Sequence, residues 1–339
     1  MKTNNILKII LLLVLSTSLF GYTKNYNKNK EVKNFIDELV KKDKFKKNEL
    51  KKLFSNVSVQ TSSLKYYTKV KKPKFEKKRY YGSWDRYEKK LLTKRRVKLG
   101  VDFMKRNKKA LGKAYKTYGV QAEYITAIIG IESYYGEYTG TYPVFDALVT
   151  LAFEENRRNK FFKSELRAFL KLMKKEKQNP KKIYGSFAGA IGLAQFMPSN
   201  FKKLAVDFNK DGKVNLNTDV DAIGSIANYF NKSGWNKKIP VATRVSYKGK
   251  RFTRLKTGFK YKYKRSRLKG IKPKSSRFYY NKKVHLVKLD RQRYDELWYG
   301  TKNFYVITRY NRSNYYAMVV HKLAQEIKKA YRKSKRKST

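Results

Sequence analysis

The chain of 339 residues contains no cysteine. This absence excludes disulfide bonds, thiolate metal sites, a cysteine nucleophile and a lipid-modified N-terminal cysteine. Histidine is also scarce: only His285 and His321 occur, far apart, and neither lies in a recognisable metal or triad motif. We therefore interpret both histidines as structural or surface residues and look elsewhere for chemistry.

Acidic side chains are few beside basic ones, with Asp+Glu 25 against Lys+Arg 83 and a formal net charge of +58. Such a surface attracts polyanions, namely nucleic acid, anionic lipid or acidic cell-wall polymers. The alternative is a lysine-rich background in which Lys replaces other polar residues, and the spread of the lysines along the whole chain favours it. A hydrophobic share of 41% still supports a folded core.

The N-terminus has the pattern of an export signal. Lys2 and Lys8 precede an apolar run at 9–15, and small polar residues at 16–18 and then Gly21 follow. The run is too short to span a bilayer comfortably, so the sequence predicts a signal peptide over 1–21, with an uncleaved anchor as the alternative. Export argues against nucleic acid as the partner of the basic surface.

The apolar periodicity predicts an α+β, mainly α fold. In a basic N-terminal extension, 22–80, it indicates two helices, one with Val32, Ile36 and Leu39 on one face and one with Leu50 and Phe54. Helical patterns dominate 81–239, including one long helix over 89–118. Short alternating runs predict a small antiparallel β lobe over 240–300. Residues 301–328 return to the helical lobe, and 329–339 form a basic tail.

Glu132 occupies a position where a buried isoleucine is expected. Ile125, Ile128 and Ile129 form one apolar stripe of a predicted helix, and Glu132 is next on that stripe. A carboxylate beside isoleucines loses hydration, which raises its pKa and suits a general acid near neutral pH. The alternative is a structural glutamate paired with a Lys or Arg.

A glycine-rich segment follows at 185–199 (GSFAGAIGLAQFMPS). Its glycines imply close packing or a tight turn. Ser186 and Gln195 are polar residues among small and apolar neighbours, as in a pocket that orients a ligand. The alternative is a glycine-rich contact between helices.

Residues 207–221 open with the D-x-N-x-D-G pattern of a calcium loop. The oxygen donors would be the side chains of Asp207, Asn209 and Asp211 and the carbonyl of Lys213. Thr218 stands at the twelfth position instead of glutamate, so Asp219 or Asp221 must close the site. The alternative is a plain Asp-Gly turn.

These segments in this order, with FYVITRYN at 304–311, resemble the B-type lytic murein transglycosylases, glycosidases that cleave peptidoglycan. The resemblance extends from about Phe35 to about Gln325. It implies a lysozyme-like helical catalytic lobe with a small β lobe inserted before the final helix. It also implies that Glu132 is the single catalytic acid and base, and that Asp221 closes the calcium loop. Cleft residues would be Ser186, Gln195, Tyr229 and Asn311, with further substrate-binding positions at Tyr87, Arg157, Arg158, Tyr310 and Tyr316.

The implied reaction needs no cofactor, although a structural Ca²⁺ is expected. Glu132 would protonate the glycosidic oxygen between N-acetylmuramic acid and N-acetylglucosamine, and then deprotonate the 6-hydroxyl that closes a 1,6-anhydro ring. A lysozyme-type muramidase, a non-catalytic wall- or polyanion-binding protein and a nucleic-acid-binding protein remain alternatives.

We expect a monomer in the periplasm of a Gram-negative bacterium. It is not a lipoprotein, because it lacks the cysteine that anchors several family members. Its partners would be peptidoglycan glycan strands, a cell-wall synthesis complex and, through its charge, an anionic membrane, with no specific nucleic acid.

Overall fold

The computed structural model describes residues 22–68 and 81–336. The chain divides into two compact units, residues 1–61 and 62–339. The first unit thus ends before residue 80, where the sequence placed the end of the basic extension. The expected signal peptide, 1–21, lies outside the described residues.

The first unit contains the two predicted amphipathic helices. Its elements are β1 (Thr23–Lys24), α1 (Lys30–Asp43), α2 (Lys47–Ser55) and β2 (Val57–Ser58), and β1 pairs antiparallel with β2. The Asn29 side chain accepts hydrogen bonds from the backbone N–H groups of Glu31 and Val32, which caps α1 at its N-terminus. Val32 and Leu39 are fully buried on the predicted face.

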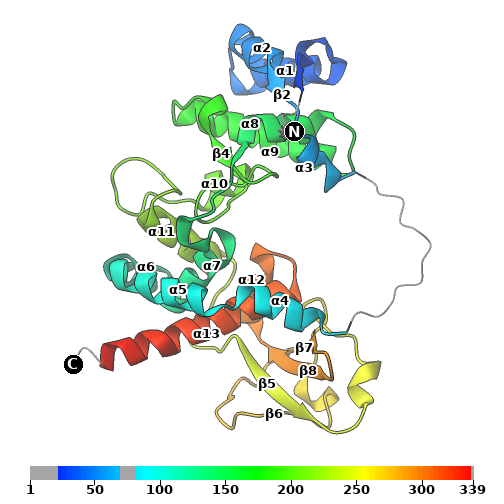
Figure 1. Ribbon diagram of the computed structural model, residues 1–339, viewed down its shortest axis with the longest axis vertical. Coiled ribbons are helices and arrows are strands. Elements are labelled where there is room, and N and C mark those ends of the chain that lie inside the picture. The colour runs from blue at the N-terminus through cyan, green and yellow to red at the C-terminus, as the bar shows by residue number, and fades with distance from the viewer. Residues whose placement is uncertain (1–21, 69–80, 337–339) are drawn as a thin grey trace, which may run out of the picture. The chain divides into compact units, whose positions relative to one another are not determined.

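The second unit holds the remaining helices. They are α3 (Thr61–Lys65), α4 (Ser83–Leu91), α5 (Lys94–Arg106), α6 (Lys108–Tyr118), α7 (Ala122–Glu132), α8 (Val144–Phe153), α9 (Asn159–Lys175), α10 (Pro198–Leu204), α11 (Asp219–Lys232), α12 (Lys302–Tyr310) and α13 (Asn314–Arg336). The long α13 packs against α5 and α7 (Figure 1). α7 is buried on nearly all sides because α5, α6, α11 and α13 surround it.

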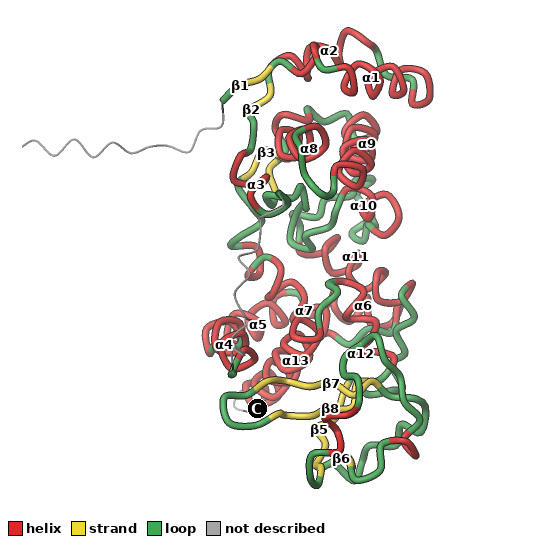
Figure 2. Tube along the Cα trace, turned by 90° about the vertical axis from the view of Figure 1, so that its right-hand side faces the viewer, coloured by secondary structure: helices red, strands yellow, loops and turns green. Residues whose placement is uncertain are grey.

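The strands of this unit form one short pair and one sheet. They are β3 (Tyr142–Pro143), β4 (Tyr184–Gly185), β5 (Ala242–Tyr247), β6 (Ile271–Pro273), β7 (His285–Asp290) and β8 (Asp295–Gly300). β3 pairs with β4, and the other four give an antiparallel sheet in the order β6-β5-β8-β7 (Figure 2). Val245, Leu286, Leu297 and Tyr299 build the core of this lobe, as its alternating runs predicted.

The prediction of one long helix over 89–118 is wrong, because three helices occupy that region. Thr93 starts α5 as its N-cap, with the side-chain oxygen accepting from the N–H of Arg96. Asn107 separates α5 from α6, and its buried side-chain amide donates a hydrogen bond to Asp219 at 2.7 Å. At the other end, α13 continues to Arg336, so the expected basic tail is helical up to that residue.

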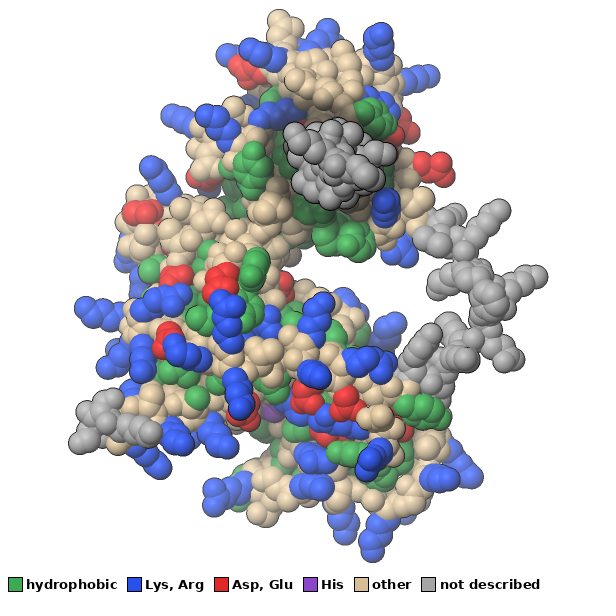
Figure 3. Space-filling view, viewed as in Figure 1, with side chains coloured by type: hydrophobic (Ala, Val, Ile, Leu, Met, Phe, Trp, Pro, Cys, Tyr) green, Lys and Arg blue, Asp and Glu red, His purple; other side chains and the backbone are tan. Residues whose placement is uncertain are grey.

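Across residues 22–68 and 81–336, no helix combines the length and the apolar character that a membrane crossing requires. Lys and Arg side chains are scattered over the face of the molecule shown in Figure 3 and do not gather in one patch. This distribution agrees with the interpretation of a lysine-rich background.

Candidate active site

Glu132 lies at the C-terminal end of α7, where the chain turns sharply. Tyr134 and Tyr135 follow with φ of 53° and 64°, in the left-handed region that non-glycine residues rarely adopt. A Cβ on Gly130 would come within 2.5 Å of the Tyr135 hydroxyl oxygen, so only glycine lets this ring fold back on the helix. The Tyr135 hydroxyl in turn donates to the carbonyl of Arg96 at 2.8 Å.

The predicted environment of Glu132 is confirmed. Its side chain is half-buried, and burial raises its pKa from 4.5 to about 7. The negative end of the α7 dipole further disfavours a carboxylate at this helix terminus. No lysine or arginine among the described residues forms an ion pair with Glu132, which rules out the structural ion pair in this part of the chain. The side chain is therefore an acid that is both near neutral pKa and accessible.

Tyrosines, not cations, surround this acid. The Tyr316 hydroxyl donates to Oε1 of Glu132 at 2.5 Å. Burial, and then the charge of Glu132, raises the pKa of Tyr316 and Tyr310 well above the usual value. Tyr87 on α4 responds in the same way, since burial and the charge of Glu132 raise its pKa. These phenols stay neutral, so they offer hydroxyl groups for hydrogen bonds and ring surfaces, but no charge.

The aromatic wall continues from Tyr316 to Tyr229. The rings of Tyr310 and Tyr316 lie nearly parallel at 6.5 Å, and Tyr229 packs on Tyr310 at 4.8 Å. The Tyr229 hydroxyl donates to the carbonyl of Arg309, and that of Tyr310 donates to the carbonyl of Ala194. α11, α12 and α13 thereby place three of the predicted residues in one wall beside Glu132.

The glycine-rich segment forms a tight loop, so the alternative of a helix–helix contact is wrong. Ser186 Oγ accepts from the N–H groups of Ala188 and Ala190, and Ile191 bridges to Phe196. Gln195 has φ of 47°, a strained conformation for a non-glycine residue.

The side-chain nitrogen of Gln195 joins the loop to the segment that follows α7. It donates to the carbonyls of Thr139 at 2.8 Å and of Gly192 at 2.9 Å. Gly140 completes this contact, because a Cβ there would lie 2.0 Å from the carbonyl oxygen of Gly185. The loop is therefore held against the chain that leaves Glu132.

Three of the predicted substrate-binding residues are exposed. Arg157 and Arg158 are exposed between α8 and α9, and the guanidinium of Arg158 lies 4.0 Å from the centre of the Phe161 ring. Asn311 is exposed at the C-terminal end of α12, directly after Tyr310.

Sequence reasoning also missed Arg96, a buried arginine that donates through Nε to the carbonyl of Gly130 at 3.0 Å. A buried cation 34 residues from its acceptor leaves no local pattern to detect. Its contact fixes the last turn of α7 two residues before Glu132.

The calcium-type loop is closed on itself by hydrogen bonds. Asp207 accepts from the N–H groups of Lys210, Asp211 and Gly212. Asp221 is fully buried and accepts from backbone N–H groups through both oxygens, whereas Asp219 bonds to Arg106 and Asn107 and points elsewhere. The structure thus favours Asp221 over Asp219 as the residue that closes the loop.

The donor set fits calcium in its chemistry. Carboxylate and amide oxygens are its preferred ligands, and each carboxylate oxygen has a second lone pair beyond the one that accepts an N–H. In the described residues, however, no three Asp, Glu, His or Cys side chains converge as a preformed metal cluster. The loop would have to tighten around an ion.

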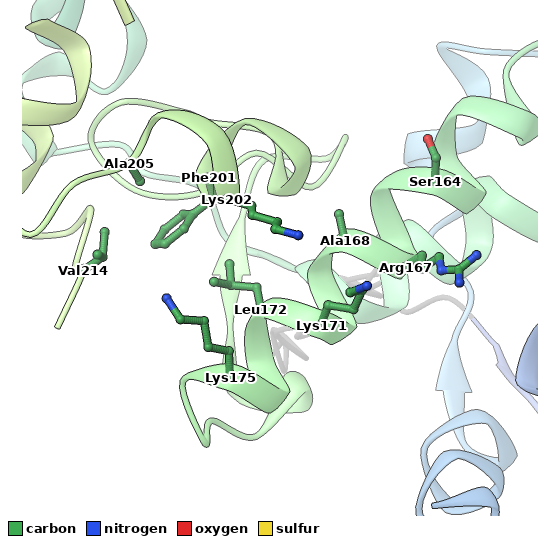
Figure 4. Close-up of a pocket in the computed structure, with 10 residues that line it drawn as sticks. All are labelled: Ser164, Arg167, Ala168, Lys171, Leu172, Lys175, Phe201, Lys202, Ala205 and Val214. Carbon is green, nitrogen blue, oxygen red and sulfur yellow. The ribbon is translucent and has the colours of Figure 1, made fainter. Parts of the chain in front are cut away.

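A separate groove of about 590 Å³ lies between α9 and α10, lined by Leu172, Phe201 and Val214 and by cations such as Lys175 (Figure 4). It includes neither Glu132 nor any other predicted substrate-binding residue. The wall of tyrosines around Glu132, and not this groove, is the candidate active site.

Comparisons with known proteins show the family of the chain. The family described as transglycosylase SLT domain matches residues 27–325. The membrane-bound lytic murein transglycosylase B of Escherichia coli (strain K12) is 39% identical over 311 residues, which cover 89% of this chain and 84% of that protein.

Two solved relatives share the fold. The Escherichia coli lytic transglycosylase Slt35 in complex with calcium superposes with a TM-score of 0.84 at 37% identity, covering 93% of this chain and 98% of the other. SltB3 from Pseudomonas aeruginosa, in complex with NAG-anhNAM-pentapeptide, gives a TM-score of 0.74 at 26% identity, covering 88% and 78%. The described helices and the small antiparallel sheet thus have the architecture of these enzymes.

Proposed function

The chain belongs to the transglycosylase SLT domain family, and on that premise we propose that it is a lytic murein transglycosylase. Its substrate would be the glycan strand of peptidoglycan, cut at the β-1,4 bond between N-acetylmuramic acid and N-acetylglucosamine. The observation that carries this proposal is Glu132, a half-buried acid with a pKa raised to about 7 and no cationic partner in the described chain.

The reaction begins with protonation of the glycosidic oxygen by Glu132. The C–O bond breaks toward an oxocarbenium-like centre, and N-acetylglucosamine leaves with the transferred proton. Glu132, now a carboxylate, removes the proton of the muramic 6-hydroxyl, whose oxygen bonds to the anomeric carbon. One carboxylate serves both steps, no water is consumed, and a 1,6-anhydro end results.

The two acidic residues that follow Glu132 in the sequence, Glu137 and Asp146, support a single-acid mechanism. Most glycosidases need a second carboxylate beside the bond. Glu137 is exposed and pairs with Arg95 at 3.3 Å, and Asp146 pairs with Lys181 at 2.7 Å. Neither is placed to act as a nucleophile together with Glu132.

The remaining residues would bind the sugars. Ser186, Gln195 and Asn311 offer polar groups for the N-acetyl and hydroxyl groups, and aromatic rings such as Tyr87 and Tyr229 offer apolar faces to sugar rings. The strained backbone of Gln195 agrees with a side chain that must be held in one orientation. A relative in complex with NAG-anhNAM-pentapeptide supports an anhydro-sugar product. Arg157, Arg158, Tyr310 and Tyr316 complete the proposed set.

Mass spectrometry of digested cell wall tests this function against a muramidase. The transglycosylase leaves anhydro ends, whereas a hydrolase leaves reducing ends that are heavier by one water. Glu132→Gln should lose lytic activity while keeping the fold. Full activity in that variant would refute the acid assignment, and wall binding without any soluble product would favour a non-catalytic protein.

We further propose that the 207–221 loop binds a structural Ca²⁺, because Slt35 has been solved in complex with calcium and the loop offers oxygen donors from Asp207, Asn209, Asp211, the Lys213 carbonyl and Asp221. Calcium at one hundred times its Kd should stabilise the fold by about 2.7 kcal/mol. Thermal unfolding with calcium or a chelator measures this, and Asp211→Ala, at an exposed position, should remove the difference. An unchanged midpoint at millimolar calcium would count against the site.

The name of the Escherichia coli relative, a membrane-bound murein enzyme, supports a location in the envelope of a Gram-negative bacterium. We place this chain in the periplasm as an exported monomer, held near anionic membrane by its charge and without a lipid anchor on cysteine. A wall-synthesis complex is the partner we would seek by crosslinking. Cell fractionation tests the location.

A further inference from the structure

α4 is a short helix that carries one of the predicted substrate-binding residues. It has nine residues, too few to persist on its own in water, and Trp84 is its one fully buried side chain in the described structure. Yet it carries Tyr87, whose ring lies 5.7 Å from that of Tyr315, the residue before Tyr316. The rings of Trp84 and Tyr315 pack against Tyr87, and ionic contacts of α4 add to this packing.

Ionic contacts fix α4 from two sides. Arg291, in the turn between β7 and β8, reaches Asp85 at 2.7 Å, Glu88 at 2.5 Å and Glu296 at 2.9 Å. From α13, Lys322 reaches Glu88 at 2.5 Å. The backbone N–H of Gln292 adds a hydrogen bond to Asp85 at 2.7 Å.

This network is largely buried, so it can contribute more to the structure than an exposed ion pair would. The side chains of Arg291 and Glu88 are each 18% exposed and that of Glu296 only 4%. Burial alone would raise the pKa of Glu296, but hydrogen bonds from Trp298 and Arg291 hold it below its usual value. Exposed ion pairs contribute little to structure, whereas removing one member of a buried set leaves uncompensated charge.

The composition makes the cluster more informative. Three of the chain's 25 acidic residues meet here, in a protein with 83 cations available almost everywhere as partners. Only a guanidinium can reach three carboxylates in a fixed fork; an ammonium on the same site has the charge but not the geometry. The cluster is thus built around Arg291.

We propose that Asp85, Glu88, Arg291, Glu296 and Lys322 form a clamp that holds Tyr87 against Tyr315, the residue next to the Glu132 partner Tyr316. Arg291 is a positioning residue, since its ion pairs are with Asp85, Glu88 and Glu296 and it acts on Tyr87 through α4. The clamp joins the β lobe to α4 and to α13, the helix that carries Tyr316, and the proposal rests on the proposed function. When the clamp opens, Tyr87 moves away and water takes its place. Glu132 then keeps Tyr310 and Tyr316 as its titratable neighbours.

A double-mutant cycle tests the clamp with purified full-length protein and peptidoglycan. Arg291→Met and Tyr87→Ala should each lower kcat/KM on the order of tenfold. The double variant should be no worse than Tyr87→Ala alone, because both act through one contact. Lys288→Met, which removes an ion pair with Asp295 on the same hairpin, is the matched control and should leave kcat/KM unchanged.

The pH profile gives a readout that a merely structural role would not move. Arg291→Met should shift the alkaline limb of kcat/KM to lower pH, as the rehydrated acid loses its raised pKa. Additive effects in the cycle, an equal loss in Lys288→Met, or a lower Tm with an unmoved profile would each overturn the clamp.

The same experiment separates the clamp from the proposed reaction. If wild-type protein releases no anhydro fragments, the function fails. If wild type is active and Arg291→Met matches it in kcat/KM and pH profile, only the clamp fails. Should Arg291→Met not fold, Glu88→Gln and Arg291→Lys, which keep part of the network, must show the same non-additivity with Tyr87→Ala, and additivity there refutes the clamp.

Discussion

Replacing Glu132 with an uncharged residue of the same shape should stabilise the protein increasingly as pH rises from about 4.5 to about 7. Burial raises the pKa of Glu132 from 4.5 in the free side chain to about 7 in the fold. The folded state therefore binds this proton more tightly than the unfolded chain does. The stability that the protonated form contributes is fully present below pH 4.5 and is lost as pH rises toward and through about 7. At 1.36 kcal/mol per unit, the loss amounts to about 3 kcal/mol.

Glu132→Gln is the perturbation that isolates this effect. Glutamine has nearly the same shape, carries no charge and can still accept the hydroxyl of Tyr316. We expect wild type and variant to have nearly equal free energies of unfolding at pH 4.5, and the variant to be more stable by about 3 kcal/mol at pH 8.

Urea unfolding followed by tryptophan fluorescence at half-unit steps of pH measures the difference directly. It needs no substrate and so does not depend on the proposed reaction. A difference that stays constant between pH 4.5 and 8 would refute the reasoning, because it would mean that Glu132 titrates alike in the folded and unfolded states.

Two further changes follow from the same site. Tyr316→Phe removes a hydrogen bond to the carboxylate, worth about 1.5–3 kcal/mol for a charged partner. The pKa of Glu132 should therefore rise by roughly one to two units, and the alkaline limb of the pH–rate profile should move to higher pH. A limb that stays or moves to lower pH would contradict this. Gly140→Ala should destabilise the fold by at least about 1–3 kcal/mol, because its φ is 105° and the new Cβ would meet the Gly185 carbonyl. Gly112→Ala is the control: nothing lies within 4 Å of a Cβ there, and we expect a gain of about 0.5–1 kcal/mol in urea unfolding. Equal losses in the two alanine variants would show that the close contact at Gly140 does not matter.

The sequence revealed the parts of the site that depend on local pattern. The stripe of Ile125, Ile128 and Ile129 gave both the helix and the desolvated acid at Glu132, because a period of 3.6 residues is visible within one segment. The tight loop that holds Gln195 was visible in its glycines. These features need no knowledge of distant residues.

What the sequence could not reveal lies in long-range contacts. The tyrosine partner of Glu132 is 184 residues away, and the clamp joins Glu88 to Arg291 across 203. The sequence named Tyr316 only through family resemblance. The helix breaks at Thr93 and Asn107 were not predicted for a related reason. Both residues are acceptable in or near helices, and the breaks depend on capping and tertiary hydrogen bonds.

The phenols around Glu132 have a consequence for the conditions in which the protein can work. Dissolved ions weaken interactions between charges, but they hardly alter the cost of drying a carboxyl group or of a neutral hydroxyl touching it. The pKa of Glu132 should thus change little with ionic strength, while the attraction of the lysine-rich surface to anionic polymers weakens as salt rises. High salt would therefore weaken electrostatic binding to anionic polymers without removing the proton from Glu132.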